Sequence, residues 1–482
     1  MKKKFLMGVS AFALVGALLT SCGGNDNGGG GLVTDGDGNV VFNDVEITFT
    51  HVITGTDSSY LTNLINEFNE EYEGQIEVIA NSVAPNDLYT SLPNLTSFRR
   101  NADVMLIHAD HVLQFAGQEG RTEGESAYFR ELEEIMETAK ITLDSADFPS
   151  QIWQNMRYND HQYGIPFDLH MAGLYVNTTL LDKLGLEMPT NREEVIACAQ
   201  AARDAGYVGL PIATGYPDTY YYQNGFYNYG GHEILVEGQE GFDANQKLSD
   251  GRVVVAQPGV YVNDASFKTA TSLRSLIFED KVTQPRIVTD GGLQDFYDGN
   301  ALFNLDGIWL LNDFINHQST AENPYEFEVL PASTLFNSAS NADCTGDIAT
   351  NGHIFVMPKN THDGEDENRQ HASMEFIKWM LEHSTDWAKS GKIAAYAPAR
   401  ESDEYKAIPH LAGFGEIDNF RCIEPNKYSY VAFSPSWQIT TYVKDFADSQ
   451  NATPPSDQQI RDYLEGLYND GLDQVKMDMT GI

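Results

Sequence analysis

The sequence is short of cysteine and of basic side chains. Its 482 residues include four cysteines, and 30 lysines and arginines stand against 70 aspartates and glutamates, which gives a formal net charge of −40 at pH 7. A field of this sign repels nucleic acid and anionic lipid, so nucleic acid is excluded as a partner. The cysteines also lack the close spacing of a zinc site, and we expect no cofactor and no metal.

Long apolar runs are absent except at the start of the chain. The run Phe5–Leu19 is shorter than the roughly 20 residues that cross a bilayer. Lysines precede it and small residues follow it, which is the layout of a secretory signal. Cys22, directly after Leu19-Thr20-Ser21, resembles the lipidated cysteine of a bacterial lipobox, which becomes the first residue of the mature protein.

These features predict a lipoprotein signal peptide over residues 1–21 and a flexible Gly-rich tether over 22–43. The protein would then lie outside the cytoplasm, anchored to the cell membrane through lipidated Cys22. The alternative is an ordinary signal peptide in which Cys22 has no role. Of the other cysteines, Cys198 lies in a helical pattern and is expected to be a buried small hydrophobe, whereas Cys344 and Cys422 are a candidate disulfide.

The remaining chain alternates between strand and helix patterns and is long enough for two lobes. Val45–Thr50, Ile76–Ile79 and Ala102–Ile107 read as strands, and a helix with an apolar face from Leu61 to Tyr72 separates the first two. This order predicts an α/β fold with a largely parallel sheet covered on both faces.

Later segments continue the alternation. Gly173–Val176 and the stretch near 301–303 read as strands. A helix is expected over about 191–205, with Thr190 and Glu193 spaced as a capping box. A final helix has Ser456 and Gln459 at the same spacing.

Four segments carry the strongest functional signal, through their order and spacing across roughly 44–480. They are Tyr163–His170 running on to Gly173–Asn177, Phe296–Ala301 running to Gly307–Trp309, Asn351–Lys359, and Glu375–Trp379 followed by Trp387–Gly391 and Ala397–Arg400. Together they resemble the extracellular solute-binding proteins of bacterial ABC transporters, specifically the sugar-binding family that includes maltose-binding proteins. The region 216–262 fits this family less clearly.

The resemblance implies a two-lobed, periplasmic-binding-protein-like fold, also called a Venus flytrap, with the ligand between lobes joined by crossing strands. The crossings are expected near Pro166–Leu174 and near Asn351–Pro358. Residues 44–167 with 353–398 would form the N-terminal lobe, and 169–350 with 399–482 the C-terminal lobe.

The resemblance also implies a non-catalytic, monomeric receptor. It would capture a sugar, expected to be an oligosaccharide, by lobe closure and deliver it to the membrane permease subunits of an ABC importer. Two alternatives remain open at this point: a binding protein for a peptide, a polyamine or a metal, and a secreted carbohydrate-active enzyme.

Sugar recognition needs aromatic rings for the apolar face of a pyranose and polar groups for its hydroxyls. Trp309 is the leading stacking residue, because Gly307-Ile308-Trp309 matches the cleft tryptophan position of the family; core packing is its alternative. Asp168 and His170 are two residues apart, so in a strand they project from the same side, toward the cleft. The alternative for Asp168 is that it holds the backbone of the hinge.

Other candidates follow strand ends, where open α/β sheets bind their ligands. Further ligand-binding candidates are Thr54 and Asp57 after the first strand, Asp110 after a buried strand, Tyr216 and Tyr220 in a tyrosine-rich stretch, and Trp437 in an expected loop. The tyrosine-rich stretch fits an oligosaccharide subsite and an exposed aromatic loop equally well. Trp379 and Trp387 are expected in the core. His108, Asp110 and His111 suggest a metal site less well, because no fourth ligand accompanies them.

Overall fold

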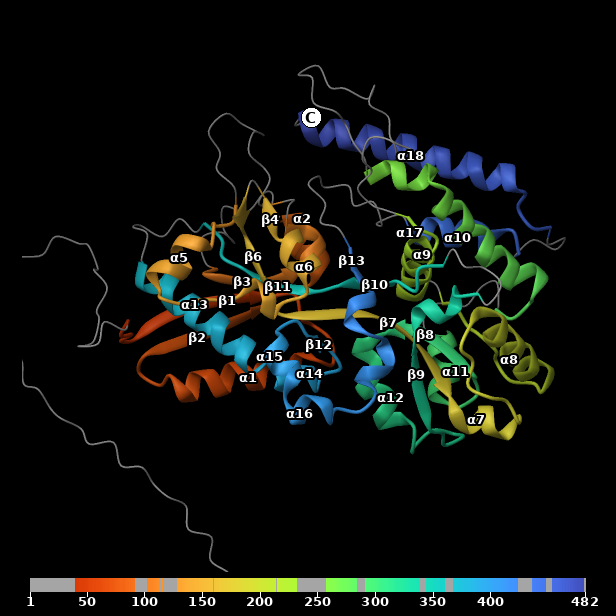
Figure 1. Cartoon of the computed structure of the whole chain (residues 1–482), viewed down its shortest axis with the longest axis horizontal. Helices are drawn as coiled ribbons and strands as arrows, with labels where there is room; N and C mark the ends of the chain where they lie inside the picture. Colours follow the sequence, from red (N-terminus) through yellow and green to blue (C-terminus); the bar gives the residue numbers. More distant parts are fainter. Residues whose placement is uncertain are drawn as a thin grey trace, which may run out of the picture.

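The computed structural model is built around two large β-sheets connected by crossing strands (Figure 1). It describes residues 40–91, 102–112, 115, 128–158, 160–213, 215–231, 257–283, 291–338, 344–359, 367–423, 436–447 and 453–480. The fold is therefore mixed α/β, as the sequence predicts. Within the described residues, no helix is both long enough and apolar enough to cross a membrane.

The first sheet has five strands in the order β2-β1-β3-β11-β6. Their bounds are Val45–His51 for β1, Ile76–Ser82 for β2, Val104–His108 for β3, Gly164–Pro166 for β6 and His353–Val356 for β11. The pairs β1–β2 and β1–β3 are parallel, as predicted, and β11 runs antiparallel to both β3 and β6.

The second sheet surrounds one long, fully buried strand, β7 (Asp168–Asn177). It pairs antiparallel with β8 (Phe303–Gly307), β9 (Phe327–Pro331), β10 (Ile348–Asn351) and β12 (Ile393–Ala394), and β10 pairs parallel with β13 (Phe420–Cys422). The expectation of a largely parallel sheet is therefore wrong here. The helix α12 connects β8 to β9, and these two strands run in the same direction. The long segment between β7 and β8 reverses the direction of the chain, so both strands are antiparallel to β7.

The chain passes between the sheets three times, the last time from β11 to β12, and we call the first two passages the crossings. It leaves β6 in the first sheet at Pro166 and enters β7 in the second at Asp168, and it returns from β10 to β11 through Gly352. The crossings touch, because a Cβ atom on Gly352 would lie 2.4 Å from the carbonyl oxygen of Asp168. A side chain at position 352 would therefore push the two crossings apart. The lobe boundaries given above stay a prediction.

Helices cover both sheets. They are α1 (Ser58–Glu71), α2 (Pro85–Ser91), α5 (Glu133–Thr138), α6 (Ser150–Asn155), α7 (Thr178–Lys183), α8 (Arg192–Asp204), α9 (Tyr216–Asn228), α10 (Asp264–Arg274), α11 (Gly291–Tyr297), α12 (Leu311–His317), α13 (Glu367–Glu382), α14 (Ser384–Ala388), α15 (Ala397–Glu401), α16 (Asp403–Lys406), α17 (Ser436–Asp445) and α18 (Asp457–Thr480). In Figure 1, α18 runs along the outside of α10 and α17.

Of the two predicted capping boxes, the one at the start of α18 is confirmed and the one at the start of α8 is wrong by one residue. Gln459 Oε1 accepts from Ser456 N at 3.0 Å, while Ser456 Oγ accepts from Gln459 N at 3.3 Å, so the predicted box of α18 is confirmed. At α8 the box is shifted by one residue. Asn191 is the N-cap and accepts from Glu194 N, and the Glu194 carboxylate accepts from Thr190 N at 2.7 Å.

The tyrosine-rich stretch is a helix, so the exposed aromatic loop, one of the two interpretations of the sequence, is not formed. Along α9, Tyr220, Tyr221, Tyr222 and Phe226 are buried, and the hydroxyls of Tyr221 and Tyr222 bond to serines of the neighbouring α10. A helix buried on most sides shows little amphipathic period, so its pattern resembles that of a loop.

The remaining structural expectations have mixed outcomes. Trp437 lies in α17 and not in a loop, because the helix begins at Ser436, directly after Pro435. Cys198 is buried, as predicted, but the disulfide is not formed, since all three described cysteines are thiols. Trp379 and Trp387 are buried, which confirms their core placement.

Candidate functional site

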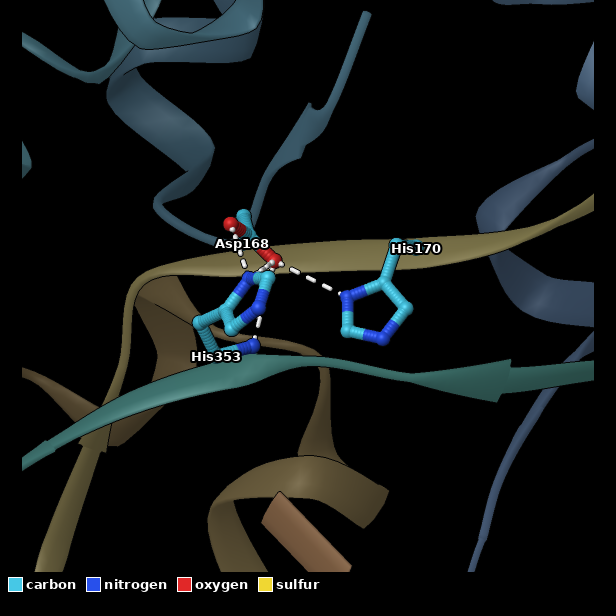
Figure 2. A group of neighbouring side chains, drawn as sticks. All are labelled: Asp168, His170 and His353. Carbon is cyan, nitrogen blue, oxygen red and sulfur yellow. Dashed lines mark hydrogen bonds and ion pairs between the residues drawn. The ribbon is translucent and has the colours of Figure 1, made fainter. Parts of the chain in front are cut away.

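The touching crossings bring a carboxylate and two imidazoles together. Asp168 and His170 come from the start of β7 and His353 from the start of β11. His353 Nδ1 lies 2.8 Å from Oδ2 and 3.0 Å from Oδ1 of Asp168, and His170 Nδ1 lies 3.4 Å from Oδ1. Figure 2 shows both imidazole rings turned toward the carboxylate. The i, i+2 spacing of Asp168 and His170 predicts that these two side chains lie on the same side of the strand.

The Asp168 carboxylate is enclosed by hydrogen-bond donors. It is fully buried, Oδ2 accepts from Trp387 Nε1 at 2.7 Å, and Oδ1 accepts from the backbone N–H of His353 at 3.1 Å. These bonds join the two crossings to α14. They support the alternative in which Asp168 holds the hinge, and direct contact between Asp168 and a ligand hydroxyl stays a prediction.

Burial and the contacts within the cluster together set the protonation of Asp168 and His170. Burial alone would raise the pKa of Asp168, but interaction with His353 and hydrogen bonds from both imidazoles hold that pKa well below its usual value. Burial lowers the pKa of His170 to about 4, although its bond to Asp168 opposes the shift. Near pH 7 the carboxylate is therefore charged and the His170 imidazole is neutral.

Two more histidines end neighbouring strands of the first sheet. The ring centroid of His108, at the end of β3, lies 4.9 Å from that of His353 and 5.7 Å from that of His170. Its Nδ1 is 2.7 Å from the hydroxyl of Tyr89 in α2. His51, at the end of β1, is also buried, and burial lowers its pKa to about 4.

Aromatic side chains continue from His170 toward solvent. The Trp309 ring centroid lies 6.3 Å from that of His170, 5.7 Å from that of Tyr220 and 5.5 Å from that of Tyr216. Trp309 is half-buried, Tyr220 is buried and Tyr216 is 67% exposed. We call Trp309, Tyr216 and Tyr220 the aromatic group. The structure thus brings together four of the predicted ligand-binding residues, counting His170.

A glycine lets the Trp309 ring lie where it does. A Cβ atom on Gly307 would lie 2.2 Å from atoms of that ring, so any other residue at 307 would displace it. Core packing does not account for Trp309 fully, because the residue is only half-buried.

The polar residues after the first-sheet strands have protein partners. The Asp57 carboxylate is 2.6 Å from Nζ of Lys392, and both side chains are largely buried. Asp110 Oδ1 accepts from Asn351 Nδ2 at 3.0 Å, beside the second crossing. Thr54 is exposed. Cys22 and the side chain of Trp437 lie outside the described residues.

Sequence reasoning missed three residues of this region as candidates for the site. His353 and Asn351 lie inside the quoted segment Asn351–Lys359, so their place beside a predicted crossing was a usable signal. Lys392 had no such signal, because its partner Asp57 is 335 positions away.

The comparisons with known proteins agree with this architecture. The family model described as bacterial extracellular solute-binding protein matches residues 54–385. A search of curated proteins finds no match.

Solved structures share the two-lobed fold at low sequence identity. The chain is similar to UgpB from Mycobacterium tuberculosis in complex with glycerophosphocholine, with a TM-score of 0.64, 12% identity and coverage of 89% of this chain and 99% of that one. It is similar to the GacH receptor of Streptomyces glaucescens, with a TM-score of 0.63, 17% identity and coverage of 89% and 98%.

A third similar structure is the cyclic α-maltosyl-1,6-maltose binding protein from Arthrobacter globiformis, with a TM-score of 0.59, 15% identity and coverage of 91% of this chain and 98% of that one. The predicted two-lobed fold is confirmed by these likenesses, and the match to the family model covers more than half of the sequence. The chain belongs to the family of bacterial extracellular solute-binding proteins.

Proposed function

We propose that the chain is the substrate-binding lipoprotein of an ABC importer and that its solute is an oligosaccharide. The observation that carries the proposal is the aromatic group beside the crossings, in which the half-buried Trp309 lies against the exposed Tyr216. Adjacent rings of this kind present apolar faces to successive sugar units, and the tyrosine hydroxyls add hydrogen-bonding groups.

The similar structures support a carbohydrate. Those solved with a ligand include a receptor in complex with acarbose and proteins bound to maltose, maltotriose, cycloalternan and mannotriose. UgpB was solved with glycerophosphocholine, which makes a non-sugar solute the second candidate. The choline group of glycerophosphocholine would also suit an aromatic surface, because a quaternary ammonium is attracted by the faces of aromatic rings.

The capture step would be lobe closure about the two crossings. A ligand that touches both lobes stabilises the closed state, and only this difference in affinity shifts the population. Delivery would require a membrane permease. Lipidated Cys22 would hold the receptor at the outer surface of the cell membrane, and the protein would act as a monomer without catalysis.

A thermal-shift screen of the purified protein tests the proposal. The panel would contain malto-, manno- and cyclic oligosaccharides, together with glycerophosphocholine, a peptide mixture and a polyamine. We expect an oligosaccharide to raise the unfolding midpoint, because it binds the folded state alone. The sugar recovered after prolonged incubation should be chemically unchanged. A shift with glycerophosphocholine alone would favour the second candidate, and hydrolysed sugar would favour an enzyme.

A further inference from the structure

The cluster of Asp168, His170 and His353 has the composition of a metal site as well as of a hydrogen-bonded hinge. One carboxylate oxygen and one imidazole nitrogen from each histidine lie within 4.8 Å of one another, and all three side chains are buried. Two histidines and a carboxylate form a recurrent ligand set for zinc and for other divalent transition metals. We propose that these three side chains bind a divalent transition-metal ion at the junction of the two crossings.

The ligand atoms are spaced almost as such an ion requires. With metal–ligand bonds of about 2.0–2.2 Å, the ligand atoms of a tetrahedral site lie about 3.3–3.6 Å from one another. Asp168 Oδ1 lies 3.4 Å from His170 Nδ1 and 3.0 Å from His353 Nδ1. Two of the three distances between ligand atoms therefore lie near those of a tetrahedral site, and the third is within 4.8 Å. The fourth position would remain for a water molecule or a ligand atom.

The surroundings hold the carboxylate in position. Trp387 Nε1 donates to Oδ2, and the backbone N–H of His353 donates to Oδ1, so the ligand oxygen is oriented by groups that would not coordinate. Partners of this kind are usual around metal-binding carboxylates. Figure 2 shows that the ligands come from both crossings, so a bound ion would link β7 to β11.

The ligand types select the class of ion. Calcium and magnesium prefer oxygen ligands, whereas two imidazoles favour zinc and neighbouring transition metals. In the metal-free state each Nδ1 can donate a proton to Asp168. An ion would replace these hydrogen bonds, and the nitrogen of each ring that coordinates the ion would carry no proton.

Equilibrium dialysis of the purified full chain tests the proposal. The protein would be treated with a chelator, then exposed to Zn²⁺ or Co²⁺ in the presence of excess Ca²⁺, which occupies carboxylate-only sites on the acidic surface. We expect one bound ion per chain, with visible absorption of the Co²⁺ form typical of tetrahedral coordination. His170→Gln and His353→Gln should each weaken binding by about tenfold or more.

His371→Gln is the matched control, because His371 is also a buried histidine but lies in α13 and bonds to Thr138. It should bind the ion like the wild type. If His170→Gln and His353→Gln both bind the ion as tightly as the wild type does, the proposal is overturned. A folded, chelator-treated wild type that binds neither ion would also overturn it, since the cluster would then be a hydrogen-bonded hinge alone. The Co²⁺ spectrum of the wild type decides the matter even where a variant fails to fold.

Discussion

The crossing cluster of Asp168, His170 and His353 and the aromatic group of Trp309, Tyr216 and Tyr220 are neighbours with opposite character. The first is buried, and the oxygens of its carboxylate bond to other parts of the protein. The second has one buried, one half-buried and one exposed member, namely Tyr220, Trp309 and Tyr216, and the last is 67% exposed. The difference teaches that the bonds of the Asp168 carboxylate are made within the protein, whereas Tyr216 and Trp309 leave surface accessible, and ligand binding by either region stays a prediction.

The largest expected effect is a loss of stability when the Asp168 carboxylate is removed. Asp168→Ala leaves Trp387 Nε1 and the N–H of His353 buried without their acceptor. The free energy of unfolding should fall by about 3–5 kcal/mol, as for other buried pairs that lose one partner. Urea denaturation measures it.

Glu465→Gln, an exposed change in α18, is the control and should unfold like the wild type. An Asp168→Ala protein as stable as the wild type would show that the cluster does not hold the crossings, and the contrast between the two regions would fail.

A smaller effect is expected from pH. Burial lowers the pKa of both His51 and His170 to about 4, below the 6.5 of an exposed histidine. Between these values the unfolded chain binds protons that the folded chain does not, so stability should fall as the pH is lowered from 6.5 to 4. Each imidazole contributes roughly 3 kcal/mol at most to this loss.

Denaturation at a series of pH values in this window measures the slope. His51→Gln should reduce the slope without removing it, because His170 still contributes. If the slope of His51→Gln equals that of the wild type, the imidazole of His51 is accessible to protons in the folded state.

The smallest effect is expected at the outer edge of the aromatic group. Tyr216→Ala should weaken oligosaccharide binding by about 0.5–1 kcal/mol, because a residue this exposed contributes as a rim contact. Isothermal titration calorimetry measures the change, and the unfolding midpoint should stay constant. A loss larger than that of Trp309→Ala would move the centre of the site from Trp309 to Tyr216.

Much of the fold was predictable because local pattern and motif order agree with it. The apolar face from Leu61 predicts α1, whose Leu61, Leu64, Ile65 and Phe68 are buried. The direction of the strands around β7 was not predictable, since it depends on how a long excursion returns. The helix α9 was missed because a helix buried on most sides lacks the period that identifies one.

The candidate site was predictable in part for a similar reason. Trp309 and His170 belong to the quoted segments, and the structure brings them to 6.3 Å between ring centroids. The predicted crossings place His353 near Asp168, but the bond between these two side chains was not predictable, because they are 185 positions apart and no local pattern pairs them. Residue type, the i, i+2 spacing with His170 and the expected crossing suggested hydroxyl binding for Asp168, and only the fold shows how many donors surround it.

The affinity of Trp309→Ala for the oligosaccharide found in the screen tests the central claim most directly. Titration calorimetry would compare it with the wild type and with Tyr207→Ala, a half-buried aromatic whose ring lies against Lys183. We predict a loss of about 1–3 kcal/mol for Trp309→Ala, with the fold retained, and none for Tyr207→Ala. Unchanged affinity in a folded Trp309→Ala protein would contradict the account, because the aromatic group would then not bind the sugar.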